Sequence, residues 1–529
     1  MYNRKEVTYH MLKAFIPFGN QLTQILRLKS LPFIIIGVGI AVRFCQYVFA
    51  KSLWLDESLL ALNIVNKSFP EFLKPLDYHQ VAPVGFLFIE KLFVQLLGNN
   101  EYALRLFPFI CGTISLFLFF KIAKHLLGNE AFLIALTLFS FSGYLINYSA
   151  EAKQYSTDVT IILFLYATTV HFQSKRLKIS HIASFGIIGA ITIWFSHPSA
   201  FVLAGIGICL SLFSLKRKDW RRISQLSIVY IIWLFSFAAF YMITFRDFHN
   251  TTSIGNIETM QNAWTGCFTP FPPTSLSDIR WFVRTFFSIF KNPIGLHYVG
   301  IAVLTFIIGC TSLFSKNKRW FFLLLSPVLI TLIVSGFHLY PFGYRLLLFI
   351  VPLVLLFIAE GAESIVNKTK DSFPMIGIIL LCLLLAQPIL KAAYNLMTQN
   401  IYRVRPIEDI KPVMNYLKKE KHEEDIIYLY HGSDIAFQYY AKQCGFDDDD
   451  YIIGIKARGT LGNYTKDLDK LRGNKRVWLL FTHVTKSAGV DEEKFFIYYL
   501  DSIGKRINHF KSEGAAIYLY DLSRIEFER

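Results

Sequence analysis

Charged side chains are scarce in this chain of 529 residues: Asp, Glu, Lys and Arg together make up 17% of it, against 53% hydrophobic and 16% aromatic residues. Soluble globular proteins average about 25% charged residues. The apolar residues form repeated runs of about 20 residues, the length that an α-helix needs to cross a bilayer. Such runs satisfy their backbone hydrogen bonds in hydrocarbon only as helices. The composition therefore excludes a soluble globular protein and predicts a mainly α, polytopic helical membrane protein.

Cysteine is sparse too, and its placement excludes two kinds of site. Of the seven cysteines, all but Cys267 and Cys444 lie inside apolar runs, and no CxxC pair occurs. Neither a disulfide framework nor a cysteine zinc site is indicated. The chain also lacks internal repeats and a glycine-rich phosphate loop, which argues against an ATP-driven machine.

The net charge of +16 reflects membrane topology rather than nucleic-acid binding. Basic residues concentrate in short loops between apolar runs, as at 216–222, and no basic stripe carries interleaved aromatic residues. The positive-inside rule places such loops in the cytoplasm. The first 30 residues are basic and have no small-residue cleavage signature, so we expect an uncleaved first helix.

The segment 81–97 decides the number of spans. It is short for a span and carries Glu90 and Lys91 near its centre, which is typical of an amphipathic helix in the outer interface. Counting it as a span would reverse the charge bias of every later loop. About eleven spans are therefore expected, with the C-terminus outside. They are 31–50, 102–123, 130–148, 155–172, 181–197, 199–214, 226–245, 295–315, 320–337, 344–361 and 374–392.

Two domains are predicted: a transmembrane domain at 1–395 and a soluble extracytoplasmic α/β domain at 396–529. Within the first, the proline-containing stretch 246–294 is expected to form a structured loop over the membrane face. Within the second, helical and strand patterns alternate. The helices are predicted at 406–420, 433–443 and 491–505, and the strands at 426–430, 476–482 and 516–521.

Two adjacent carboxylates, Asp56 and Glu57, stand where the first span leaves the bilayer, in the stretch SLWLDES. Carboxylates at that depth are costly unless they face a polar cavity. One interpretation is that Asp56 caps an interfacial helix beginning at Glu57, because Asp is a favoured N-cap. The other is an active site at the membrane face.

The expected topology brings further uncommon polar residues to the same face. They are Asp77-Tyr78-His79, Glu151-Ala152-Lys153, His197, His338 and Tyr344-Arg345. Each also has an ordinary explanation: His197 as a helix-end residue, Lys153 as an interface anchor. Arg43, inside the first span, either snorkels or faces the site near Asp56.

The chemistry of these groups suggests transfer from an anionic lipid. Asp56 or Glu57 could act as a general base toward an incoming hydroxyl. Lys153 and Arg345, with Tyr344 beside the arginine, could bind a phosphate. A divalent metal is conceivable at Glu57, Glu151 and His79, although no spacing is diagnostic.

Three stretches carry a family resemblance: LWLDES, DYHQVAPVGFLFIEKLFVQLLGNNEYALRLFPFICG and INYSAEAKQYSTDVTIILFLY. They resemble the GT-C superfamily of membrane glycosyltransferases, in particular the protein O-mannosyltransferases and the aminoarabinose transferases of lipid A, over roughly residues 30–395. The resemblance implies a polyprenyl-phosphate-linked sugar donor and inversion at the anomeric carbon. It places Asp56 at the acidic position of the first outer loop and Glu151 at that of the second. Lys153 then matches a position that is often arginine, and Arg345 an arginine that opens a late span.

The expected function is therefore a glycosyltransferase of the cytoplasmic membrane, bacterial, with its site and C-terminal domain on the outer face. The acceptor could be a lipid, a glycan or a protein. A polymerase or block-transfer ligase with the same donor chemistry is the nearer alternative. A flippase for lipid-linked sugars is the more distant one, because it should show inverted repeats or paired broken helices.

Overall fold

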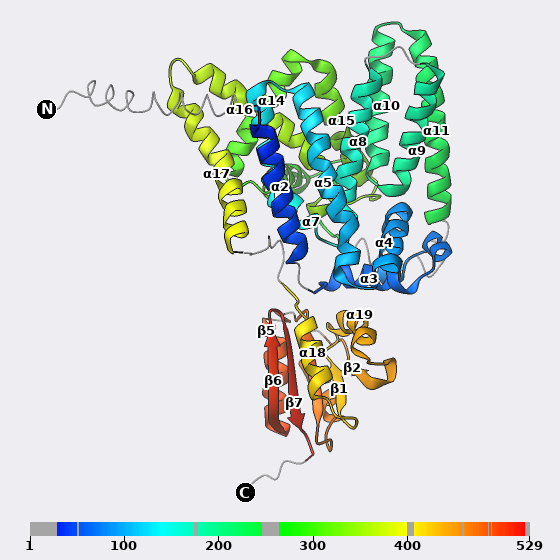
Figure 1. The fold of residues 1–529 in the computed structure, drawn as a ribbon, viewed down its shortest axis with the longest axis vertical. Helices are drawn as coiled ribbons and strands as arrows, with labels where there is room; N and C mark the ends of the chain where they lie inside the picture. Colours follow the sequence, from blue (N-terminus) through cyan, green and yellow to red (C-terminus); the bar gives the residue numbers. More distant parts are fainter. Residues whose placement is uncertain are drawn as a thin grey trace, which may run out of the picture.

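The computed structural model describes residues 29–49, 52–173, 178–245, 264–398, 402, 407–457, 460–484, 486–487 and 489–523. A bundle of long helices forms most of the molecule, and a small domain that contains a β-sheet lies at one end of it (Figure 1). The first part of the predicted outer loop, 246–263, lies outside the described residues.

Every predicted span is helical. Eight helices among the described residues are long and apolar enough to cross a membrane, which confirms the polytopic helical class. Three predicted spans remain. Helices α6 and α9 are apolar but shorter than the eight, and α8 is neither among the eight nor among the shorter apolar helices. The helices are α2 (Leu31–Val48), α5 (Glu101–Leu126), α6 (Asn129–Phe141) with α7 (Gly143–Tyr148), α8 (Tyr155–Gln173), α9 (Ile179–Phe195), α10 (Ser199–Lys216), α11 (Trp220–Phe245), α14 (Val299–Lys316), α15 (Lys318–Gly336), η4 (Tyr344–Ile350) running into α16 (Val351–Thr369), and α17 (Pro374–Thr398).

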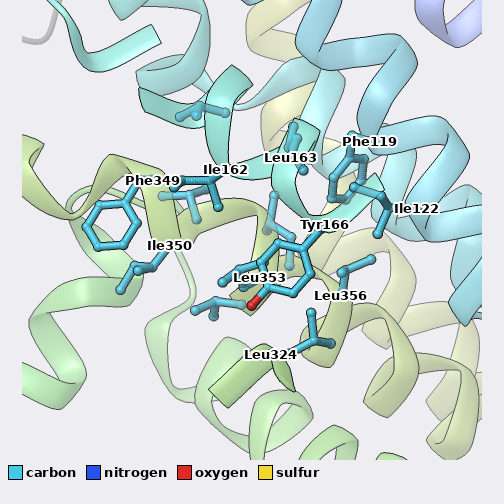
Figure 2. Close-up of a cluster of buried hydrophobic side chains, with 14 of the residues drawn as sticks. Phe119, Ile122, Ile162, Leu163, Tyr166, Leu324, Phe349, Ile350, Leu353 and Leu356 are labelled. Carbon is cyan, nitrogen blue, oxygen red and sulfur yellow. The ribbon is translucent and has the colours of Figure 1, made fainter. Parts of the chain in front are cut away.

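Close packing fixes the inner helices of the bundle. A Cβ atom at Gly309 of α14 would lie 1.8 Å from the Phe357 carbonyl oxygen of α16, so only glycine permits this approach. Tyr166 of α8 is buried among aliphatic and aromatic side chains of the neighbouring helices (Figure 2). Its hydroxyl donates to the Leu323 carbonyl oxygen at 2.6 Å. Interiors packed this tightly are rigid, so the ends of α8 and α16 offer fixed points for a site.

The first predicted outer segment, between α2 and α5, lies at the end of the bundle that faces the small domain (Figure 1). Its elements are α3 (Leu55–Asn66), η1 (Phe69–Leu73), η2 (Asp77–His79) and α4 (Val84–Leu97). Helix α4, the predicted interfacial helix, is not among the helices apolar enough for a span. Helix α3 has Trp54 at its N-cap, so the alternative in which Asp56 caps a helix beginning at Glu57 is wrong. Both carboxylates lie in the first turn, where the helix dipole favours negative charge.

The second outer segment contains α13 (Leu276–Lys291). Ser275 caps this helix by accepting a hydrogen bond from the Asp278 amide. Leu276, Ile279 and Val283 are exposed along it. This is the kind of structured element that the sequence predicts for 246–294.

The C-terminal domain is a five-stranded mixed sheet in the order β2-β1-β3-β7-β6. Strands β2, β1 and β3 are parallel, and β7 pairs antiparallel with both β3 and β6. The predicted strands correspond to β1, β3 and β7, whereas β2, β6 and helix α20 are additional. The elements are α18 (Lys411–Glu420), β1 (Ile426–Leu429), α19 (Asp434–Cys444), η5 (Asp448–Asp450), β2 (Tyr451–Ile453), α20 (Leu461–Asp469), β3 (Val477–Thr482), β4 (Lys486–Ser487), β5 (Val490–Asp491), α21 (Glu492–Ile503), β6 (Lys505–Ser512) and β7 (Ala515–Asp521).

Candidate active site

Asp56 and Arg345 form an ion pair across 289 residues of sequence. Asp56 comes from the first turn of α3 and Arg345 from η4. The guanidinium lies near three aromatic rings, with its Cζ 5.8 Å from the ring centre of Trp54, 5.7 Å from that of Tyr155 and 5.4 Å from that of Trp264. These cation–π contacts restrict the arginine. The Asp56 side chain remains 21% exposed, so its carboxylate is fixed and still accessible.

Glu57, the neighbouring carboxylate, is enclosed instead. Arg105 of α5 donates from Nε to Oε1 at 2.9 Å and from Nη2 to Oε2 at 2.7 Å. The amide of Ala152 donates to Oε1 at 2.7 Å. The two charged side chains are only 2% and 5% exposed. Glu57 therefore joins α3 to α5 and to the loop before α8, and both of its oxygens are engaged.

That loop, 149–154, carries Glu151 and Lys153, both buried. Lys153 donates from Nζ to Gln80 Oε1 at 2.7 Å, and Glu151 Oε2 accepts from Asn147 Nδ2 at 3.2 Å. Burial, assisted by the negative charge of Glu57, raises the pKa of Glu151 to about 8. Burial lowers the pKa of Lys153, against the opposing effect of Asp56. Burial therefore favours the neutral form of Glu151, which reduces the negative charge beside Asp56.

Asp56, Glu57, Glu151, Lys153 and Arg345 act on one another electrostatically, so the structure brings these five predicted residues together.

The remaining candidates lie elsewhere or point away. Tyr344 is 57% exposed and His79 is exposed as well. His197, in the turn between α9 and α10, packs against Phe240 with ring centres 5.5 Å apart. Arg43 is buried in α2 and donates to the carbonyl oxygens of Gly39 at 3.0 Å and Ser140 at 2.9 Å. Its role is to tie α2 to α6.

A metal site at Glu57, Glu151 and His79 is not formed. Among the described residues, no group of three or more His, Cys, Asp or Glu side chains could hold a metal ion. The physical reason is that Arg105 and the Ala152 amide already engage Glu57, while His79 is exposed.

Several residues of this site escape sequence reasoning. Arg105, Tyr155, Trp264 and Gln80 all contact the charged cluster. Only Arg105 gives a usable signal, because a cation within an apolar run needs a buried partner, either a carboxylate or backbone carbonyls.

One stretch of the chain matches a family model. Residues 80–244 match the family model described as dolichyl-phosphate-mannose-protein mannosyltransferase. No curated protein matches the sequence at a significant level.

Solved structures are similar in fold at low identity. ArnT from Cupriavidus metallidurans in the apo state superposes with a TM-score of 0.52 and 10% identity, over 93% of this chain and 98% of that one. The same protein bound to undecaprenyl phosphate gives 0.49 and 10%, over 92% and 97%. An Archaeoglobus fulgidus oligosaccharyltransferase, in a complex with Zn and sulfate, gives 0.49 and 12%, over 85% and 68%. The family-model match and the shared fold confirm the resemblance to the GT-C superfamily of membrane glycosyltransferases.

Proposed function

We propose that this chain transfers a sugar from a polyprenyl-phosphate donor to an acceptor hydroxyl. The observation that carries the proposal is the pairing of one accessible carboxylate, Asp56, with Arg345, beside a second cation, Lys153. A general base next to two cations suits a reaction that deprotonates a hydroxyl and releases a phosphate. The family model, named for dolichyl-phosphate-mannose, supports a donor of this class.

In the proposed mechanism, the acceptor oxygen attacks the anomeric carbon while the bond from that carbon to the phosphate oxygen breaks. Asp56 accepts the hydroxyl proton. The bonding electrons leave with the polyprenyl phosphate, whose growing negative charge Arg345 and Lys153 stabilise. A single displacement inverts the anomeric configuration.

The ion pair with Asp56 does not prevent Arg345 from binding phosphate. A guanidinium has five N–H donors; the hydrogen bond to Asp56 uses Nη2, and Nε has no hydrogen-bond partner among the described residues. The arginine can therefore hold the base and the leaving group together, which would place Asp56 close to the bond that breaks.

We place this site on the outer face of the cytoplasmic membrane. The clustering of basic residues in the opposite loops, such as 216–222, supports that orientation. The lipid tail of the donor would lie between the apolar helices of the bundle.

The test is transfer from a panel of radiolabelled polyprenyl-phosphate sugars in membranes that contain the wild type or Asp56→Asn. Transfer that disappears in the variant supports the proposal and identifies the donor sugar. Equal transfer by both would remove Asp56 from the mechanism. Turnover of lipid-linked glycans alone would favour a polymerase or block-transfer ligase, and movement of donor across the membrane without turnover would favour a flippase.

A further inference from the structure

The four residues before Asp56 are bound largely by the C-terminal domain. The Ser52 amide donates to Asp409 Oδ1 at 3.3 Å, and the Ser52 hydroxyl donates to the same atom at 2.6 Å. The Leu53 amide donates to the Tyr440 hydroxyl at 2.9 Å. The Leu55 amide donates to Glu408 Oε2 at 3.0 Å. Glu408, Asp409 and Tyr440 of the small domain thus all bind the segment 52–55, which presents the proposed base.

Glu408 caps the first amide of α3, that of Leu55. The first amides of a helix have no partner within it and need an acceptor from elsewhere. Trp54, at the N-cap, contributes no acceptor of the usual Ser, Thr, Asp or Asn kind. Glu408 accepts from Leu55, the first residue of α3, and its other oxygen lies 2.6 Å from His483 Nδ1. The carboxylate is therefore oriented from within the C-terminal domain.

The contact continues into a shared core. Leu53 is fully buried and belongs to one hydrophobic cluster with Ile64 of α3, Met414 of α18 and Phe437 of α19. At its edge, Glu101 of α5 accepts from the Tyr440 hydroxyl at 2.9 Å and from Lys411 Nζ at 3.1 Å. This contact has a buried apolar centre and charged hydrogen bonds around it. Such a surface holds the C-terminal domain in one orientation against α3 and α5.

We infer that the C-terminal domain positions Asp56, and that Glu408, Asp409 and Tyr440 are the positioning residues. The inference rests on the proposed function, because it assigns a consequence to the placement of Asp56. Lys153 and Arg345 lie on other elements, the 149–154 loop and η4. Arg345 also contacts Trp54, so loosening 52–55 should impair the base strongly and donor binding to a smaller extent.

The test compares two adjacent tyrosines in the full-length protein. Tyr440→Phe removes the acceptor of the Leu53 amide. Tyr439→Phe is the matched control, because its hydroxyl also crosses to the membrane domain but donates to Asn99 Oδ1 at 2.8 Å, away from 52–55. Hydrogen–deuterium exchange of a peptide covering 52–57 should be about tenfold faster in Tyr440→Phe, as expected for one lost hydrogen bond, and unchanged in Tyr439→Phe. In the transfer assay, kcat should fall about tenfold in Tyr440→Phe with a smaller change in the donor KM, because small misplacements of a reacting group are costly.

Two results would overturn the inference: equal exchange in the two variants, or faster exchange in Tyr440→Phe with wild-type kcat. The exchange measurement needs no substrate, so it stands even if Asp56→Asn retains full transfer and the proposed role of Asp56 fails. If Tyr440→Phe does not fold, Glu408→Ala takes its place with the same peptide, and Glu408→Gln is its control because glutamine retains one acceptor oxygen for the Leu55 amide. A Glu408→Gln protein that exchanges and turns over like Glu408→Ala would contradict the cap.

Discussion

Asp56 and Glu57 are adjacent in sequence, and each is paired with an arginine, yet the two pairs are built differently. Arg105 holds Glu57 through two hydrogen bonds in a nearly solvent-free position. Arg345 holds Asp56 through one nitrogen, and part of the carboxylate stays exposed. An enclosed ion pair such as Glu57–Arg105 supports the fold, whereas a pair whose carboxylate is still partly exposed can also serve chemistry.

The largest effect expected is on activity at the exposed pair. Asp56→Asn keeps the size of the side chain but removes the base, so transfer should fall by about 10²–10⁴-fold. Thermal unfolding of the detergent-solubilised protein should change little. Asp77→Asn is the control, because Asp77 lies in the same outer segment, is 62% exposed and pairs with Lys67. Comparable losses in both variants would show that any charge change in this segment is harmful.

At the enclosed pair, the effect should fall on stability. Glu57→Gln leaves the guanidinium of Arg105 buried without its counter-ion, which costs about 3–5 kcal/mol. The yield of folded protein and the unfolding temperature should both drop. The double variant Glu57→Gln/Arg105→Gln should recover part of that loss, because it leaves no uncompensated charge. A double variant no more stable than Glu57→Gln would mean that the pair is not the stabilising feature.

Conservative substitutions at the two arginines should separate an effect on donor binding from an effect on stability. Arg345→Lys keeps the charge but loses the planar donors and much of the contact with the three aromatic rings. We expect the donor KM to rise about tenfold with nearly unchanged unfolding temperature, as one phosphate hydrogen bond is lost. Arg105→Lys should do the reverse, lowering the unfolding temperature while the remaining folded protein keeps its KM. If both variants changed the donor KM and the unfolding temperature in the same way, the two ion pairs would not differ in role.

The difference between the pairs also explains what could be predicted from the sequence. The spans follow from local apolar runs, and the strands β1, β3 and β7 from their buried apolar residues. Strand β6, KRINHFKS, is mostly exposed and polar at the sheet edge, so it has no apolar alternation to detect. Asp56 and Arg345 were recognisable as polar residues at the membrane face, but their pairing spans 289 residues and depends on tertiary packing. The same holds for Glu57, which the sequence did not distinguish from Asp56, and for Arg105, which was not among the predicted site residues.

Glu151 interacts electrostatically with members of both ion pairs. A substitution there should have the smallest effect, and it tests whether the enclosed pair influences the loop beside Asp56. Burial and the charge of Glu57 raise its pKa from an ordinary 4.5 to about 8, while Arg345 acts in the opposite direction. Between these values the folded protein holds a proton that the unfolded chain has released. The free energy of unfolding contributed by this group is therefore greatest below about pH 4.5 and falls as pH rises through about 8.

Glu151→Gln removes this titration. Relative to wild type, the variant should gain stability as pH rises from 6 to 9, by at least about 2 °C in unfolding temperature. Glu130→Gln, at an exposed position in α6, should show no such gain. Combining Glu151→Gln with Glu57→Gln should shrink the effect, because the charge of Glu57 is one of the causes of the raised pKa. A gain that persists undiminished in the combined variant would mean that burial alone holds the proton on Glu151, and that the enclosed pair has no electrostatic influence on the loop beside Asp56.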